Sequence, residues 1–187
     1  MHYHAEVYLK ELKNVEEQIE RILHPYSEHL EIEYDEEDEY WCNPDSFWDW
    51  YQIGGRWTGI HTDYNPEDDE RNIEMCGYCD GTGFRDDKVG REIREKNPSF
   101  TCNSCKGKGK SVKWPTQWAL YDGDIISVDK VKSDLSCYTL IINDKVFHKE
   151  DWNGSKWDVT DFDGNVKNKL EELNIKDGFL VTVDYHN

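Results

Sequence analysis

The sequence has 187 residues, with 22 Lys and Arg against 40 Asp and Glu, which gives a formal net charge of -18 at pH 7. A chain this negative is repelled by phosphate backbones and anionic lipid head groups, which excludes wrapping of duplex DNA. Only 36% of the residues are hydrophobic, but the 8 Trp allow a core built from a few large side chains, so we expect one folded, strongly acidic domain.

The first segment of the chain is predicted to form a β-strand followed by an α-helix. Residues 2–9 alternate as in a strand, and His2 and His4 share one face, where we expect a partly buried edge-strand pair rather than a metal site. Four apolar residues then fall on one helical face: Val15, Ile19, Ile22 and Leu23. The N-terminus has no signal-peptide pattern and no apolar run spans a bilayer, so we expect a cytoplasmic protein without membrane contact.

An acidic run follows between Glu28 and Asp49. It holds ten carboxylates and no Lys or Arg. Such a surface can compete for the basic, nucleic-acid-binding surface of another protein, because complementary charge speeds the encounter. The alternative is that the charge only keeps an aromatic-rich protein soluble.

The segment from Trp48 to Gly59, WDWYQIGGRWTG, is unusually rich in aromatic residues. Residues 43–46 before it (Asn-Pro-Asp-Ser) combine an N-cap side chain, a proline and a first-turn acid, and Gly54-Gly55 supply a stop. We therefore predict a helix in this segment rather than a strand. The same start signal returns at residues 65–68 (Asn-Pro-Glu-Asp).

Two interpretations of this aromatic segment are open. It can be the core of a chain with few aliphatic residues, or a groove for a peptide or for a planar ligand such as a base. The paired glycines allow a sharp turn, after which the Arg56 guanidinium is expected to stack on a tryptophan. The candidate binding residues are Trp48, Trp50, Tyr51, Arg56 and Trp57.

The same string resembles a Trp-Asp-Trp-Tyr-x-x-Gly-Gly-Arg-Trp-x-Gly segment carried by small, poorly characterised proteins of bacteriophages. The similarity spans about a dozen positions, residues 48–59. It implies a phage protein acting in the cytoplasm of its host, and it brings no established activity with it.

Two Cys-x-x-Cys pairs, with 22 residues between them, form the strongest chemical motif: Cys76, Cys79, Cys102 and Cys105. Four thiolates can surround one Zn²⁺ tetrahedrally, and they close its coordination shell, so we predict one structural zinc ion. A redox-active Cys-x-x-Cys is the alternative, and it is disfavoured because we expect neither a strand before the first pair nor a long helix after it. Cys42 and Cys137 have no paired spacing and are expected to be small buried residues.

Each pair continues as Cys-x-x-Cys-x-Gly-x-Gly, over residues 76–83 and 102–109. This repeat resembles that of the cysteine-rich zinc domain of DnaJ-type chaperones, in which four repeats form two zinc sites. The His-Pro-Asp signature of a J domain is absent, and the nearest string is His24-Pro25-Tyr26. The resemblance therefore implies half of that zinc domain, a zinc-stapled hairpin that supports contacts with protein clients.

The cysteine-rich stretch is basic within an acidic chain. From Cys76 to Lys113 there are nine basic and five acidic residues, a sum of +4, which a four-thiolate zinc site would reduce to about +2. Lys106, Lys108 and Lys110 alternate with small residues after the second pair. Binding of single-stranded nucleic acid through these lysines is therefore an alternative function.

The C-terminal part is predicted to contain two strands, a helix and a final strand. Residues 137–142 and 146–148 form the strands around Asn143-Asp144, residues 164–173 the helix with Asp163 as its cap, and residues 179–185 the last strand. Together with the opening β-α unit, this order predicts an α+β fold, a ferredoxin-like sandwich. The acidic body would comprise residues 1–75 and 111–187, and the zinc hairpin would be inserted at residues 76–110.

The motifs favour binding over catalysis. The chain has no Gly-x-Ser-x-Gly elbow, and Ser104 stands where a P-loop needs its first glycine. An enzyme acting through unidentified carboxylates is thus the least supported alternative. We predict a non-enzymatic, zinc-binding protein-interaction module that binds or inhibits a host protein.

Overall fold

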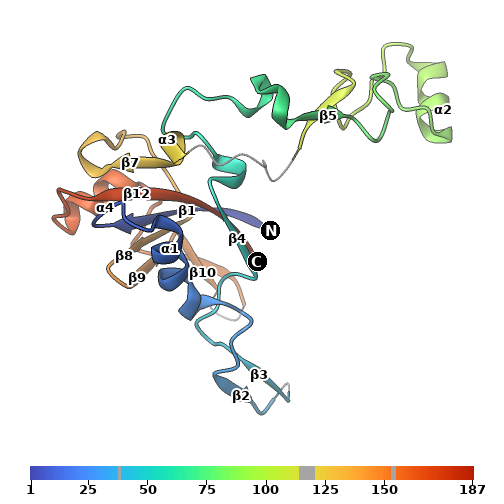
Figure 1. Ribbon diagram of the computed structural model, residues 1–187. Helices are drawn as coiled ribbons and strands as arrows, with labels where there is room; N and C mark the ends of the chain where they lie inside the picture. Colours follow the sequence, from blue (N-terminus) through green and yellow to red (C-terminus); the bar gives the residue numbers. More distant parts are fainter. Residues whose placement is uncertain (38, 114–120, 153–154) are drawn as a thin grey trace. The chain divides into compact units, whose positions relative to one another are not determined.

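The computed structural model describes residues 1–37, 39–113, 121–152 and 155–187 (Figure 1). It divides the chain into two compact units, which we call the body (Met1–Asp63 and Ala119–Asn187) and the cysteine unit (Tyr64–Trp118). The cysteine unit has ten acidic and ten basic residues, so the body carries the whole net charge of -18. The excess of acidic residues therefore lies entirely in the body, and the cysteine unit has no formal net charge.

The body is built on a six-stranded sheet in the order β4-β12-β1-β8-β9, with β7 also paired to β12. The strands are β1 (His2–Leu9), β4 (Trp50–Ile53), β7 (Ile125–Ser127), β8 (Thr139–Ile142), β9 (Lys145–His148) and β12 (Phe179–His186). β1 pairs antiparallel with β12 along its whole length and parallel with β8. The predicted first strand is therefore confirmed, but it lies inside the sheet and not at its edge.

Short helices and hairpins complete the body. The helical segments are α1 (Val15–Leu23), η1 (His24–Tyr26), η2 (Gly55–Trp57), α3 (Tyr121–Asp124), η5 (Val128–Lys130) and α4 (Val166–Glu172). Two hairpins stand apart from the large sheet: β2 (Glu33–Asp35) with β3 (Tyr40–Cys42), and β10 (Glu150–Trp152) with β11 (Trp157–Val159). The sequence patterns did not indicate these hairpins.

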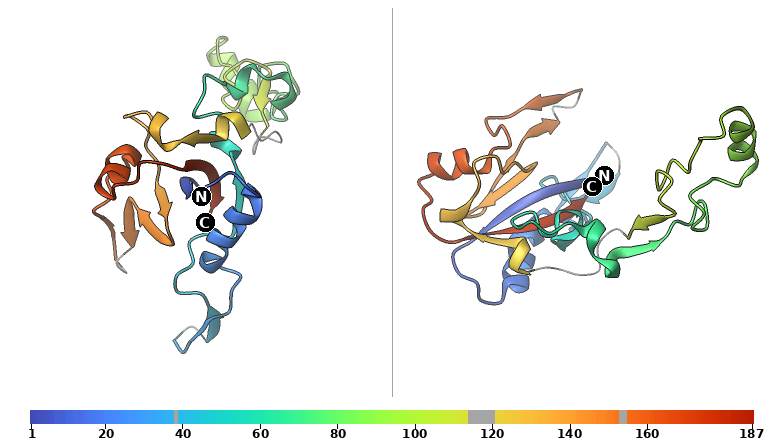
Figure 2. Two further views of the ribbon diagram at one scale, coloured as in Figure 1. Left: turned by 60° about the vertical axis from the view of Figure 1, so that its left-hand side comes forward. Right: turned by 90° about the horizontal axis from the view of Figure 1, so that it is seen from above.

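Helices α1 and α4 cover opposite faces of the sheet (Figure 2). α1 buries Ile19 in a cluster with Ile141 of β8, whereas α4 buries Leu170 in a second cluster with Leu140 and Ile142 of the same strand. Because side chains alternate along a strand, these two clusters lie on different faces. The core therefore has two parts with the sheet between them.

The α+β class is confirmed, but the ferredoxin-like arrangement is not. In that arrangement both helices cover one face of the sheet, and the second strand of the central hairpin lies beside the first strand of the chain. Here the helices lie on opposite faces, and β8, the first strand of the hairpin, lies beside β1. The expected elements thus form, but they are arranged differently.

Local signals in the C-terminal part are mostly confirmed. Asn143 and Asp144 have φ of 49° and 63°, as expected for the turn between β8 and β9. The cap of α4, however, is Asn165, whose side chain accepts a hydrogen bond from the N–H of Asn168, while Asp163 accepts one from the N–H of Asn165. The helix therefore begins at Val166, two residues later than the sequence pattern predicts.

The helix predicted after residues 43–46 is wrong. Asn43 accepts a hydrogen bond from the N–H of Asp45, but the turn does not continue, and Trp50–Ile53 forms strand β4 against residues 183–186 of β12. Pairing with β12 satisfies the backbone of this segment and buries Ile53, so tertiary contacts outweigh the local start signal. The similar signal at residues 65–68 does form a turn of 3₁₀-helix, η3 (Pro66–Asp68), capped by Asn65.

The cysteine unit consists of turns around a two-stranded sheet. β5 (Ile73–Met75) pairs antiparallel with β6 (Lys110–Val112), and η4 (Glu70–Asn72) precedes β5. α2 (Lys88–Lys96) lies between the two cysteine pairs in the sequence and is capped by Asp87. β5 ends directly before the predicted insertion at residues 76–110 and β6 extends past its end, so the compact unit is wider than that insertion.

Candidate metal centre

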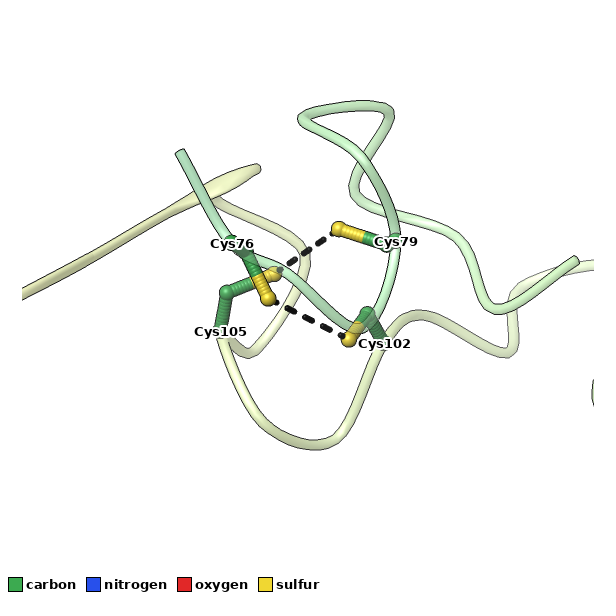
Figure 3. A group of neighbouring side chains, drawn as sticks. All are labelled: Cys76, Cys79, Cys102 and Cys105. Carbon is green, nitrogen blue, oxygen red and sulfur yellow. Dashed lines mark hydrogen bonds between the residues drawn. The ribbon is translucent and has the colours of Figure 1, made fainter. Parts of the chain in front are cut away.

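The four cysteines of the two repeats converge (Figure 3). Their Sγ atoms lie within 4.8 Å of one another, all four side chains are buried, and none is in a disulfide. Sγ of Cys76 is 4.0 Å from that of Cys102, and Sγ of Cys79 is 3.7 Å from that of Cys105. A tetrahedral site with Zn–S bonds of about 2.3 Å places its sulfurs about 3.8 Å apart, so these thiols fit one metal ion.

The two repeats hold each other by matched backbone contacts. The N–H of Cys76 donates to the carbonyl of Gly109 at 3.0 Å, and the N–H of Cys102 donates to the carbonyl of Gly83 at 2.7 Å. The first cysteine of each repeat is thus bonded to the last glycine of the other. This exchange explains why the pattern needs two copies to form one site.

The last glycine of each repeat cannot carry a side chain. A Cβ on Gly83 would lie 2.4 Å from the carbonyl oxygen of Gly107, and a Cβ on Gly109 would lie 2.2 Å from that of Gly81. Both residues also have positive φ, 76° and 70°. Only glycine combines this conformation with so close an approach of two backbones.

The electrostatics of the site favour a bound cation. Burial raises the pKa of Cys79 to about 11. Burial acts in the same direction on Cys105, but the N–H of Gly109, 3.2 Å from its Sγ, and the neighbouring thiols lower the pKa of Cys105 to about 7. Four buried thiolates repel one another unless a cation neutralises them, so metal binding and deprotonation of this site are coupled.

The expectation that no strand precedes the first cysteine pair, which counted against a redox-active pair, is wrong. Strand β5 does precede Cys76, although it has only three residues. What argues against a redox pair is the pairing of the sulfurs: the close contacts join the first repeat to the second. A set of four converging thiols is a chelating arrangement.

The lysines after the second pair lie in an electrically mixed surface. Lys106, Lys108 and Lys110 line an open groove of about 1270 Å³ beside the cysteines. The groove is also lined by four acidic residues: Glu67, Asp68, Glu70 and Glu74. Nζ of Lys108 is 2.9 Å from Oε2 of Glu67. The acidic flank therefore offsets the basic stretch within this unit.

The candidate residues of the Trp-rich segment are distributed over several contacts. Trp48 donates its indole N–H to the carbonyl of Leu23, and its ring meets Tyr51 edge-on at 5.0 Å. Trp50 is 38% exposed and lies edge-on to His2, whereas Trp57 stacks on His4.

Arg56 has an exposed side chain, and its backbone N–H donates to Oδ2 of Asp184 at 3.0 Å. Among the five candidate residues, Trp48 and Tyr51 are in ring contact with each other. Both contribute to the core on the α1 face. Trp50 and Tyr51 are neighbours on strand β4 and therefore face opposite sides of the sheet. A role of these residues in binding stays a prediction.

A buried polar network was missed by the sequence patterns. Glu6 is fully buried, and its Oε1 accepts hydrogen bonds from Nε2 of His4 at 2.8 Å and from Oγ1 of Thr182 at 2.9 Å, with Nε2 of His61 3.4 Å away. Burial raises the pKa of this carboxyl, but His4 and His61 lower it to about 2. Oε2 of Glu6 has no partner among the described residues. The signal in the sequence is that Glu6 shares the strand face of His2 and His4, the two residues expected to form an edge-strand pair.

The paired glycines of the Trp-rich segment lie directly against this polar face. A Cβ on Gly55 would lie 2.3 Å from Cβ of Asp184, and one on Gly54 would lie 2.5 Å from Oδ2 of Asp124. Both aspartates are fully buried, and Asp184 also bonds to the ring of His2 at 2.8 Å. The two glycines thus allow the backbone of this segment to pass close to two buried carboxylates.

Comparison with protein-family models, curated proteins and solved structures found no match to this chain. None of the helices in the described residues is long and apolar enough to cross a bilayer. The features of the chain that bear on function are the cysteine site, the groove beside it and the distribution of charge.

Proposed function

We propose that the chain is a non-enzymatic zinc-binding protein whose cysteine unit binds a segment of a host protein and so inhibits or modulates it. The metal is assigned as one structural Zn²⁺ because four thiolates with this spacing suit a tetrahedral, redox-inert ion and leave no open position for a reacting water. Its role is to hold together two repeats that expose most of their surface and whose buried cluster consists of the four cysteines.

The observation that carries the proposal is the groove beside the cysteines. Its apolar part is formed by Ile73, Met75 and Val112, and Met75 is 65% exposed. Acidic and basic side chains line the rest. A polypeptide offers apolar groups and charges of both signs, and therefore complements such a lining.

Nucleic-acid binding through Lys106, Lys108 and Lys110 is the weaker alternative. A phosphate backbone would meet the carboxylates of Glu67 and Glu74 in the same groove. The unit as a whole has as many acidic as basic residues. The lysines are more readily understood as one side of a mixed protein-binding surface.

The proposed setting is the cytoplasm of a bacterial host. The resemblance of residues 48–59 to bacteriophage proteins supports it, and so does the use of cysteines as metal ligands, because thiols stay reduced in that compartment. A small acidic phage protein of this kind would act by occupying a surface of a host factor.

The test is crosslinking with mass spectrometry in host lysate, using the full-length, zinc-loaded chain. A Met75→Ser variant changes an exposed side chain in the groove, and Val159→Ser, 73% exposed in the body, is the matched control. We expect protein crosslinks from the cysteine unit that weaken with Met75→Ser and persist with Val159→Ser. Crosslinks to nucleic acid alone, or protein crosslinks indifferent to Met75→Ser, would refute the proposal.

A further inference from the structure

The β2–β3 hairpin forms an arm that projects from the sheet of the body, and we call residues 28–45 the acidic arm (Figure 1). Its base is fixed by Asn43, which is 4% exposed and donates hydrogen bonds from Nδ2 to the carbonyls of Pro25 at 2.8 Å and Ser27 at 2.9 Å. The body thus holds the base of the arm in place while the hairpin extends into solvent.

One face of the arm exposes large apolar side chains. Tyr34 and Trp41 are cross-strand partners with ring centroids 5.6 Å apart, and they are 46% and 55% exposed. Ile32, on the same face by alternation, is 57% exposed. An isolated two-stranded hairpin is only marginally stable in water, and formation of this hairpin leaves its aromatic face largely exposed.

The charge around this face restricts what can cover it. The arm has nine acidic residues, and no Lys or Arg occurs anywhere between Arg21 and Arg56. Phosphate backbones and anionic lipid head groups are repelled by such a field. The complementary surface is one that carries Lys and Arg beside an apolar stripe.

We propose that the acidic arm binds, through its Tyr34–Trp41 face, an apolar stripe on a partner protein that is flanked by Lys and Arg. The aromatic pair would supply most of the affinity, since exposed ion pairs contribute little and aromatic residues dominate interface energies. The carboxylates would speed association and exclude other partners. This proposal rests on the proposed protein-binding function and adds a contact surface on the other unit.

The test uses two synthetic helical peptides of equal length and charge, one with a stripe of Leu flanked by Lys and one with Ser in place of each Leu. At physiological salt, the full-length chain should bind the Lys–Leu peptide at least about tenfold more tightly than the Lys–Ser peptide. Tyr34→Ser and Trp41→Ser should each weaken Lys–Leu binding about tenfold. Trp157→Ser, at a site 57% exposed on the β10–β11 hairpin, is the matched control and should leave binding unchanged.

Equal binding of both peptides, or equal losses with Trp41→Ser and Trp157→Ser, would overturn the proposal. Trp41→Phe keeps an aromatic ring and should retain most of the binding, and circular dichroism verifies that each variant is folded. Measuring Met75→Ser in parallel separates the two proposals. Loss with Met75→Ser alone would support the groove and overturn the arm, whereas loss with Trp41→Ser alone would support the arm.

Discussion

Glu6 and His4 lie two residues apart on β1, and Nε2 of the histidine is 2.8 Å from Oε1 of the carboxylate in a part of the body closed to solvent. Trp57 stacks on the same histidine, and His61 approaches the same oxygen. Trp57 of the Trp-rich segment therefore covers a buried, hydrogen-bonded pair on the sheet. This contact accounts for Trp57, whereas Trp48 and Tyr51 pack in the core on the α1 face.

Replacing Glu6 by Gln should destabilise the body. The change keeps the shape of the side chain but removes the charge that His4 and His61 face, at a cost of about 2 kcal/mol in the free energy of unfolding. Urea unfolding measures this cost, with Glu11→Gln, on an exposed residue, as the control. Equal midpoints for the two variants would contradict the prediction.

The stability of the body should fall in acid because of Glu6. Its pKa is lowered from 4.5 to about 2, so its stabilising contribution is complete above pH 4.5 and is lost as the pH falls toward 2. The shift corresponds to about 3 kcal/mol. Between pH 5 and 2 the wild-type chain should lose about this much more stability than Glu6→Gln, as measured by denaturant titration at each pH. Parallel pH profiles for the two proteins would be inconsistent with this assignment.

One zinc ion per chain should copurify with the protein without added metal. Cys102→Ser removes one of four ligands, and we expect it to lose stoichiometric zinc, as measured by elemental mass spectrometry. Cys42→Ser lies outside the site and should keep the metal. A wild-type chain without stoichiometric metal, with four freely titratable thiols at the site, would refute the zinc assignment.

Gly109→Ala should weaken the metal site although it changes no ligand. The new Cβ would meet the carbonyl of Gly81 at 2.2 Å in a residue with φ of 70°, and we expect a loss of at least about 2 kcal/mol in zinc affinity. Gly77→Ala is the control, because a Cβ there has no neighbour within 4 Å. Chelator competition measures both variants. Equal losses of zinc in both variants would contradict the prediction that the close backbone approach of Gly109 and Gly81 stabilises the site.

Local patterns in the sequence were sufficient for several elements of the fold. Alternation predicts β1, helical spacing predicts α1, and Asn143-Asp144 predicts the turn of the β8–β9 hairpin. The cysteine spacing predicts the four converging thiols, because a repeated pair can close around one ion without help from distant residues. In each case the information lies within one segment or one repeated motif.

The tertiary structure decided what these local patterns leave open. Trp50–Ile53 became a strand because β12 offered it a partner, and His4 and Glu6 became buried because Trp57 and His61 lie over their face of β1. The cysteine unit became electrically neutral because β5 brings the acidic flank at residues 67–74 into the same unit as the lysines. The sequence alone determined periodicity, spacing and total charge. Strand partners, burial and the grouping of charges depend on contacts between residues far apart in the chain, and only the folded chain determines those.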